Sequence, residues 1–272
     1  MKLIDAHCHL DDDRFTEDLD EVISRFREKG GKVIVTSGVN PKNNRKALEI
    51  MGKYPDVVRV SFGIFPIDAI IDKLTTRSKE NNYRKIDSFD LDSELSWIEE
   101  HKDECVAIGE VGLDYSDMEV KESEELRNLQ KENFRKIIDL AKKLGKTIVV
   151  HTRKAESDCI DLLEEKSAEK VILHCFTGNK KLIRRAAELG WTFTVPCVIT
   201  RLEHFKMLVE MLPLSQLLTE TDGAFLSPVA GTRNEPANIE LTIKEIAKIK
   251  NLSEEEVSEK IFENYEKLFG RE

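Results

Sequence analysis

Short apolar runs alternate with longer amphipathic segments along the whole chain. The short runs are rich in Val, Ile and Leu, which is typical of strands buried on both faces of a sheet. Eight such strands are expected, in residues 3–9, 32–36, 57–62, 105–114, 147–150, 171–173, 191–195 and 216–219. The segments between them carry apolar residues at the spacing of one helical face, as at Leu19, Val22, Ile23 and Phe26. The pattern therefore predicts strands and helices in regular alternation.

Local signals place the ends of several helices. Gly30 follows the first predicted helix, and Gly145 follows a long helix at about residues 122–144, because glycine accepts the left-handed conformation at a helix C-terminus. Ser253, with Glu256 three residues later, is the signature of a capping box at the start of the last helix.

Eight strand–helix units without a Pro- or Ser-rich linker or an internal repeat favour one architecture. A doubly wound open sheet is the alternative. However, this number of units in 272 residues predicts a closed (β/α)8 TIM barrel, an α/β fold with its active site at the carboxyl ends of the strands. We expect a single domain over residues 1–272. Its irregular part is a charged excursion at about residues 68–100, expected to be a solvated segment followed by a short helix.

Composition limits the partners that this chain can bind. It has 42 Lys and Arg against 52 Asp and Glu, a formal net charge of −10. An acidic chain is a poor non-specific binder of polyanions, so a nucleic-acid substrate would have to be held locally by bound cations or a few arginines. No apolar run approaches the length that spans a membrane, so no membrane partner is expected. The sequence does not fix the oligomeric state, and a monomer is the default expectation.

The cysteines and the N-terminus predict a cytoplasmic location. The five cysteines are odd in number and form no Cys-x-x-Cys pair, which favours a reducing compartment without a disulfide framework. The chain enters its first strand directly, without the basic and apolar regions of a signal peptide.

Side chains that bind metal ions fall at the predicted carboxyl ends of the strands. Six potential ligands are placed there, namely His7, His9, Glu110, His151, His174 and Asp222. In a barrel these ends meet at one rim. One histidine at the rim is readily explained as a packed core residue, but four with two carboxylates are not, because clustered buried polar groups need partners. His101 and His204 fall in helical or loop contexts and are left out of the set.

This set suits two divalent ions. His7 and His9, with a carboxylate, are expected to hold one of them. His151 and His174 are expected to hold the other, and the two oxygens of Glu110 can bridge the pair. Ions held in this way acidify a bridging water and give hydroxide near neutral pH. Nitrogen and oxygen ligands without thiolate fit zinc, manganese, magnesium or a similar ion.

The two carboxylates have different expected roles. Asp222 would ligate the first ion and take the proton of the attacking water as general base, whereas Glu110 acts as the bridge. Cys8 and Cys175 adjoin ligands, but neighbouring residues on a strand point to opposite faces, so both cysteines are expected to pack.

Six segments that contain or flank these residues occur in a distinctive order. They are DAHCHL at 5–10, GEVGLD at 109–114, VHTR at 150–153, HCFTG at 174–178, ETD at 220–222 and RNEP at 233–236. Together they resemble the TatD family of metal-dependent deoxyribonucleases, within the amidohydrolase-like barrel superfamily. The resemblance implies the ligand roles given above, with Glu110 as the bridge where other amidohydrolase barrels often use a modified lysine. It also implies hydrolysis of DNA phosphodiesters.

Three positions depart from the family pattern. Phe65, in the segment 63–66, stands where the family commonly has histidine, so the imidazole on that side is missing. Lys154 stands where the family usually has an acidic residue, and the loop at 226–232 lacks a basic residue often found there. Phe65 and Phe176 are candidates to stack on a base, although phenylalanines at a rim more often pack. These departures bear on the choice of substrate and leave the barrel and the ions unchanged.

Two arginines are the best candidates to grip a phosphate. The guanidinium groups of Arg153 and Arg233 can pair bidentately with phosphate oxygens. The alternative is that either arginine forms an internal ion pair, with Glu220, Glu235 or Asp158. The sequence leaves both alternatives open.

Three functions remain in view. The leading one is hydrolysis of a phosphoester by metal-activated water, in DNA according to the family resemblance. The second keeps the ions but hydrolyses an amide, lactone or ester of a small molecule, which the apolar Phe65 leaves open. The third is a non-catalytic barrel that binds a partner through the excursion at residues 72–92, and the intact ligand set argues against it.

Overall fold

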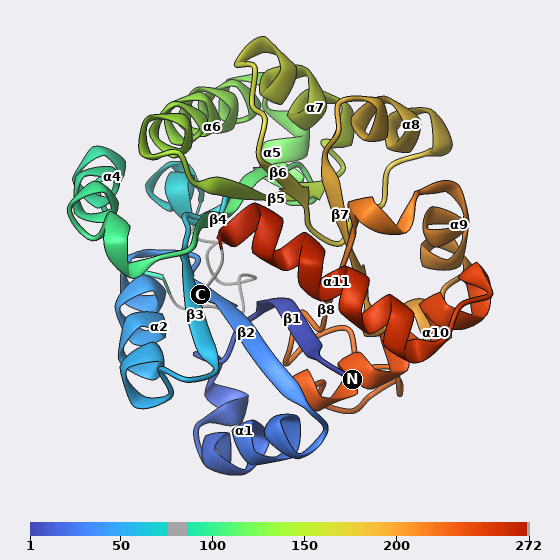
Figure 1. Cartoon of the computed structure of the whole chain (residues 1–272). Coiled ribbons are helices and arrows are strands. Elements are labelled where there is room, and N and C mark those ends of the chain that lie inside the picture. Colours follow the sequence, from blue (N-terminus) through green and yellow to red (C-terminus); the bar gives the residue numbers. More distant parts are fainter. Residues whose placement is uncertain (76–85, 271–272) are drawn as a thin grey trace.

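The computed structural model of the chain describes residues 1–75 and 86–270. Within these residues eight strands form one sheet in the order β1 to β8, and every neighbouring pair is parallel. The strands are β1 (Leu3–Cys8), β2 (Gly31–Ser37), β3 (Val58–Phe62), β4 (Ala107–Asp114), β5 (Thr147–Arg153), β6 (Val171–Leu173), β7 (Thr192–Pro196) and β8 (Leu217–Glu220). Just beyond β8 the Asp222 amide donates to the His7 carbonyl of β1 at 2.9 Å, so the sheet curls into a nearly closed barrel (Figure 1). The predicted TIM barrel is confirmed.

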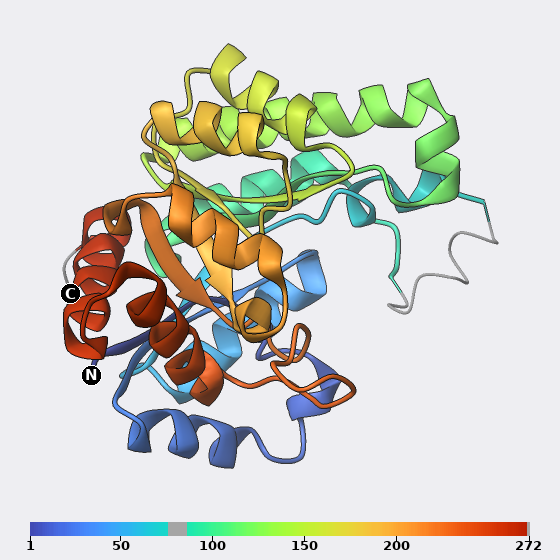
Figure 2. The ribbon, with the colours of Figure 1, turned by 90° about the vertical axis from the view of Figure 1, so that its right-hand side faces the viewer.

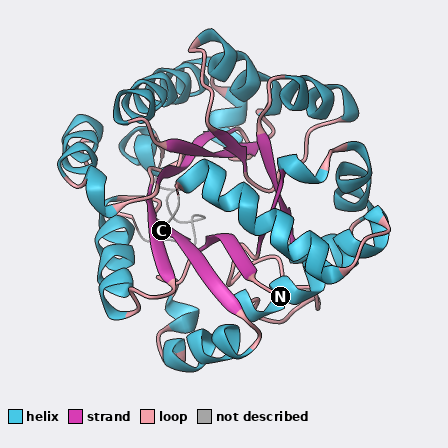
Figure 3. Ribbon diagram, in the orientation of Figure 1, coloured by secondary structure: helices cyan, strands magenta, loops and turns pink. Residues whose placement is uncertain are grey.

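Helices surround the sheet on its outside (Figure 3). In the described ranges the α-helices are α1 (Leu19–Glu28), α2 (Pro41–Lys53), α4 (Leu91–Glu100), α5 (Met118–Glu122), α6 (Glu124–Leu144), α7 (Glu156–Glu165), α8 (Lys180–Glu188), α9 (Glu203–Met211), α10 (Ile239–Lys250) and α11 (Glu254–Phe269). Helix α1 buries Val22, Ile23 and Phe26 of the predicted face. Ile23 and Phe26 join the main core, whereas Val22 packs with Phe15 and Ala224 in a smaller cluster. None of the helices described is long and apolar enough to cross a membrane.

The predicted helix ends are present in the structure. Gly145 follows α6 with a φ of 66°, in the left-handed region that favours glycine. At the start of α11 the Ser253 side chain accepts from the Glu256 amide, while the Glu256 side chain accepts from the Ser253 amide. This capping box satisfies backbone donors that have no partner within the helix.

The two ends of the barrel are built differently. Helix α11 crosses the end at which the strands begin (Figure 1). There the buried Asn264 donates from Nδ2 to the carbonyls of Leu214 and Leu217, each at 2.8 Å. The loops that follow the strands lie at the opposite end, as the side view shows (Figure 2). The carboxyl ends of the strands are therefore left uncovered by α11.

The position of His151 along its strand differs from the sequence prediction. It was expected to follow a strand that ends at residue 150, but it lies inside β5, while Glu110 lies inside β4 as it does inside the predicted strand 105–114. The reason is that these two strands continue as a pair to Asp114 and Arg153, whereas β6 pairs with β5 only as far as Val150. Both side chains are thus level with the ends of the shorter strands.

The charged excursion is described in part. It contains the 3-10 helix Asp68–Lys73 and, as the expected short helix, α4. Residues 76–85 of the predicted excursion lie outside the described residues.

Replacing Ser253 by alanine is expected to destabilise the fold by about 1 kcal/mol, because the first amides of α11 lose their capping acceptor. Urea unfolding followed by circular dichroism measures the change. Ser96→Ala, on the exposed side of α4, is the matched control and is expected to change stability by less than about 0.5 kcal/mol. Equal stability of S253A and the wild type would contradict the role of the capping box.

Candidate metal centre

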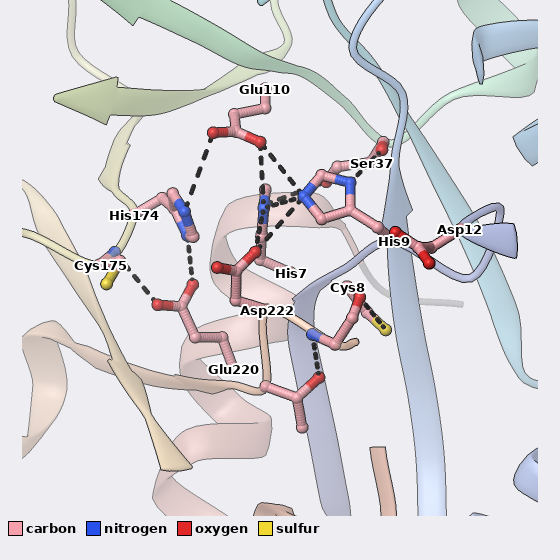
Figure 4. Close-up of polar contacts among 12 residues, drawn as sticks. His7, Cys8, His9, Asp12, Ser37, Glu110, His174, Cys175, Glu220 and Asp222 are labelled. Atoms are coloured by element: carbon pink, nitrogen blue, oxygen red, sulfur yellow. Dashed lines mark hydrogen bonds and ion pairs between the residues drawn. The ribbon is translucent and has the colours of Figure 1, made fainter. Parts of the chain in front are cut away.

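The side chains of His7, His9 and Asp222 gather beside Glu110 at the carboxyl ends of the strands (Figure 4). His7 Nε2 lies 3.2 Å from His9 Nε2 and 3.6 Å from Asp222 Oδ1. His9 Nε2 lies 3.4 Å from the same Asp222 oxygen. Glu110 Oε2 is 3.5 Å from His7 Nε2 and 3.3 Å from His9 Nε2. Two imidazole nitrogens and two carboxylate oxygens therefore face one another.

The other oxygen of Glu110 faces a second pair of histidines. Glu110 Oε1 lies 2.7 Å from His151 Nδ1 and 3.9 Å from His174 Nε2. His151 is carried by β5, and His174 directly follows β6. One carboxylate therefore stands between two pairs of histidines with one oxygen toward each, which is the arrangement of a bridging ligand.

Two overlapping groups bring ligand atoms close enough to share an ion. The groups are His7, Glu110 and His174, and His7, His9 and Asp222. Within each group the ligand atoms lie no more than 4.8 Å from one another. His151 is outside both groups, although its Nδ1 is the imidazole nitrogen nearest to Glu110. The structure thus brings all six predicted ligands to one pocket.

The ring nitrogens that point away from the pocket are held by the barrel wall. Ser37, the last residue of β2, serves two of them: its hydroxyl lies 3.1 Å from His7 Nδ1 and its carbonyl 2.9 Å from His9 Nδ1. Glu220 Oε2 lies 2.6 Å from His174 Nδ1. Each of these partners holds its ring in orientation and fixes which nitrogen faces the ligand position.

His151 is held in the same way by Asp114, whose Oδ2 lies 3.1 Å from His151 Nε2. This role of Asp114, and the corresponding roles of Ser37 and Glu220, were not predicted from the sequence. Spacing is a usable signal for the two carboxylates. Asp114 comes four residues after Glu110, and Glu220 two residues before Asp222, and even spacing on a strand places side chains on one face.

The donor set fits divalent cations. The carbonyl of Ser37 only accepts, so His9 Nδ1–H donates to it and Nε2 is the nitrogen of His9 that faces the pocket. Asp114 likewise accepts from His151 Nε2–H, and Nδ1 is the nitrogen of His151 directed at Glu110 Oε1, 2.7 Å away. A proton on such a nitrogen donates to the neighbouring carboxylate. A divalent cation held by these residues would take the place of such protons, because metal binding requires neutral imidazole and ionised carboxylate.

The charges in the pocket stabilise one another despite burial. Burial raises the pKa of Glu110, but hydrogen bonds from His151, His7 and His9 outweigh it and hold that pKa well below its usual value. Burial lowers the pKa of His174, yet the Glu220 carboxylate outweighs burial and brings it to about 9. The Glu110 carboxylate is therefore ionised at neutral pH, as metal ligation requires, whereas His174 carries a proton that a metal ion would have to displace.

The two aromatic candidates occupy different surroundings. The ring centroid of Phe65 lies 4.7 Å from that of His151, edge to face, so Phe65 forms part of the wall beside the second histidine pair. Phe176 is fully buried and packs edge-on against Phe193, with centroids 5.7 Å apart. Phe176 is a core residue and is not available to stack on a base.

The two arginines also differ. Arg233 binds Asp18 bidentately, with both N–O distances at 2.6 Å, and lies 4.8 Å above the ring of Phe15. This is the internal ion pair that the sequence left open, with Asp18 as its main partner and Glu235 at 3.7 Å. Arg153 ends β5 and is exposed, and no carboxylate of the described residues pairs with its guanidinium.

A parallel barrel whose strand ends gather four histidines and two carboxylates is the architecture of a metal-dependent hydrolase. The model of the family described as TatD related DNase matches residues 4–270. The chain belongs to the TatD family, and the predicted resemblance is confirmed.

Two relatives align over almost their whole length. A metal-dependent hydrolase of Methanocaldococcus jannaschii, named as uncharacterized, is 36% identical, and the alignment covers 100% of this chain and 98% of the relative. The human deoxyribonuclease TATDN3 is 34% identical, with coverage of 99% and 95%.

Solved structures share the fold. The TatD homologue YJJV of Escherichia coli has a TM-score of 0.84 at 22% identity, covering 99% of this chain and 98% of its own. A TatD family hydrolase of Entamoeba histolytica has a TM-score of 0.81 at 24% identity, with coverage of 99% and 98%.

Replacing Glu220 by glutamine is expected to weaken divalent metal binding about 10- to 100-fold, because the His174 ring loses the charged partner that orients it. Isothermal titration of the metal-free protein with Zn²⁺ or Mn²⁺ measures the affinity. Glu188→Gln, on the exposed end of α8, is the matched control and should bind metal like the wild type. Unchanged affinity in E220Q would show that Glu220 has no part in the centre.

Proposed function

We propose that this protein is a deoxyribonuclease that hydrolyses DNA phosphodiesters with two divalent ions. The observation that carries the proposal is the Glu110 carboxylate, whose two oxygens face two separate pairs of histidines. Ions about 3.5–4 Å apart suit the displacement of an oxygen from phosphorus. The name of the 34% identical human relative, a deoxyribonuclease, supports DNA as the substrate.

In the proposed centre each ion has its own pair of histidines, and one carboxylate is common to both. The ligands are His7, His9 and Asp222 for the first ion, His151 and His174 for the second, and Glu110 for both. When bound, the ions supply Lewis acidity and lower the pKa of a coordinated water. Nitrogen and oxygen donors suit zinc, manganese or magnesium, and the assay below compares the three.

Asp222 is the proposed general base. Its side chain is 16% exposed against 5% for Glu110, so it is the more accessible of the two to an incoming water. Burial raises the pKa of Asp222, but the hydrogen bond with His9 and the charges of the other histidines outweigh it, and the pKa lies below its usual value. The carboxylate is thus ionised and able to accept a proton as the phosphodiester is cleaved.

Arg153 is the proposed grip for a substrate phosphate. It stands two residues after His151, and within the described part of the chain its charge is not matched by a carboxylate. Arg233, the other candidate for this role, is left out of the proposal because its charge is already paired with the Asp18 carboxylate. On a chain with a net charge of −10, the affinity for DNA should be modest and should fall with salt.

A second candidate function keeps the ions and hydrolyses a small-molecule amide, lactone or ester. The observation that favours it is Phe65, which gives the wall beside His151 an apolar ring in place of a hydrogen-bonding group. A panel of chromogenic esters and phosphodiesters separates the two functions. The non-catalytic alternative is set aside because the family is hydrolytic, and its proposed contact includes residues 76–85, outside the described residues.

The location and the oligomeric state stay predictions. All five cysteines are free in the structure, as expected in a reducing compartment. We propose a cytoplasmic location on that basis, and a monomer stays the default expectation.

Asp222→Asn is expected to lower kcat on single-stranded oligonucleotides by about 10²–10⁴-fold, because the amide cannot accept the proton. Cleavage is assayed with Mg²⁺, Mn²⁺ or Zn²⁺ added to metal-free protein, and bound metal is measured in parallel. Asp161→Asn, in the exposed part of α7, is the control and should cleave like the wild type. Full activity in D222N would rule out its role as base.

Arg153→Ala is expected to raise KM for oligonucleotides and to reduce the slope of log affinity against log salt by about 1, as loss of one phosphate contact requires. Arg233→Ala should leave that slope unchanged and lower only the stability, because it breaks the pair with Asp18. Fluorescence anisotropy with labelled oligonucleotide at several salt concentrations measures both variants. The opposite pattern would assign the phosphate contact to Arg233.

A further inference from the structure

Two buried amide side chains grip the main chain directly behind the metal centre. Asn44, on α2 and fully buried, bonds both backbone groups of Gly63: its Nδ2 donates to the carbonyl and its Oδ1 accepts from the amide, each at 3.0 Å. Gln130, on α6 and 1% exposed, bonds the main chain of Asp114 in the same way: its Nε2 donates to the carbonyl at 3.0 Å and its Oε1 accepts from the amide at 2.9 Å. A buried amide is retained only where such partners satisfy it.

The residue that Asn44 grips supports the backbone of Glu110. A Cβ added to Gly63 would lie 2.1 Å from the amide nitrogen of Glu110, so the two main chains are in direct contact. Gly38 supports the same residue, because its carbonyl accepts the Glu110 amide at 3.1 Å. A Cβ at Gly38 would lie 1.9 Å from Asn44 Oδ1. Asn44 therefore contacts both glycines on which the backbone of Glu110 rests.

A third hydrogen bond fixes the orientation of the Asn44 amide. Its Nδ2 also donates to Oε1 of Glu94 at 2.7 Å, and Glu94, on α4 and 3% exposed, is ion-paired with Arg45. Both donors and the acceptor of Asn44 are thus engaged. The side chain cannot rotate without leaving buried polar groups unsatisfied.

The residue that Gln130 grips orients a proposed ligand of the second ion. Asp114 Oδ2 lies 3.1 Å from His151 Nε2, while its other oxygen accepts the Ser116 amide at 2.8 Å. Gln130 holds the main chain of Asp114 at both its amide and its carbonyl, so the carboxylate is held at a fixed place relative to the His151 ring. The support runs from α6 through β4 to β5.

We propose that Asn44 and Gln130 are positioning residues of the metal centre, Asn44 for Glu110 and Gln130 for His151 through Asp114. The inference rests on the ligand assignment of the proposed function. It has a consequence that separates the two residues. Asn44 acts on the carboxylate shared by both ions, and Gln130 acts only on the second ion.

The test compares Asn44→Ala and Gln130→Ala with Asn264→Ala by titration of the metal-free proteins with Mn²⁺, followed by calorimetry, together with thermal unfolding of each. Asn264 is the matched control because it is a buried helical asparagine that binds two main-chain carbonyls at the other end of the barrel. We expect N44A to weaken both Mn²⁺ binding steps about 10- to 100-fold, as loss of an orienting partner does. Q130A should weaken the second step alone, and N264A should lower the unfolding temperature without changing either step.

If N44A or Q130A retains both wild-type affinities while losing stability like N264A, the residue is merely structural and the inference is overturned. Asn44→Ser and Gln130→Asn, which keep a hydrogen-bonding group, replace any alanine variant that fails to fold, under the same criteria. A wild-type protein that binds no divalent ion overturns the proposed function together with this inference. Wild-type binding with unchanged variants overturns this inference alone.

Discussion

One buried carboxylate, shared by two pairs of imidazoles, is the interaction on which the rest of the site depends. Glu110 is only 4% exposed, and a carboxylate so far from water is unfavourable unless cationic or hydrogen-bonding groups surround it. Here the surrounding groups come from β1, β5 and β6, and from the residues just after them. The parallel direction of all the strands makes this possible, because it brings their carboxyl ends to one place.

The fold and the positions of the six candidate ligands could be predicted because both depend on local sequence patterns. Apolar runs in alternation with amphipathic segments specify strands and helices, and the ligands come at or near the ends of those runs. The place of His151 within β5 could not be predicted in this way. It depends on how far β4 and β5 stay paired, which is a property of two strands together.

Contacts between distant parts of the chain account for the rest of what the sequence missed. Arg233 and Asp18 are 215 residues apart, and nothing near either residue marks the other as its partner. Asn44 lies inside α2, and nothing near it in the sequence marks it for a role at the site. Its hydrogen bonds reach Gly63 and Glu94, on other elements, so its burial became evident only in three dimensions.

The two ends of the barrel have different roles: one end stabilises the fold, and the other carries the candidate metal centre. At one end α11 and the side chain of Asn264 bind the strands where they begin, and at the other lie the donors of the metal centre. Substitutions that raise the stability of the protein to heat or solvent can therefore be concentrated at the end of the barrel where the strands begin. Substitutions that retarget the enzyme belong in the loops above, and the two kinds of engineering need not interfere with each other.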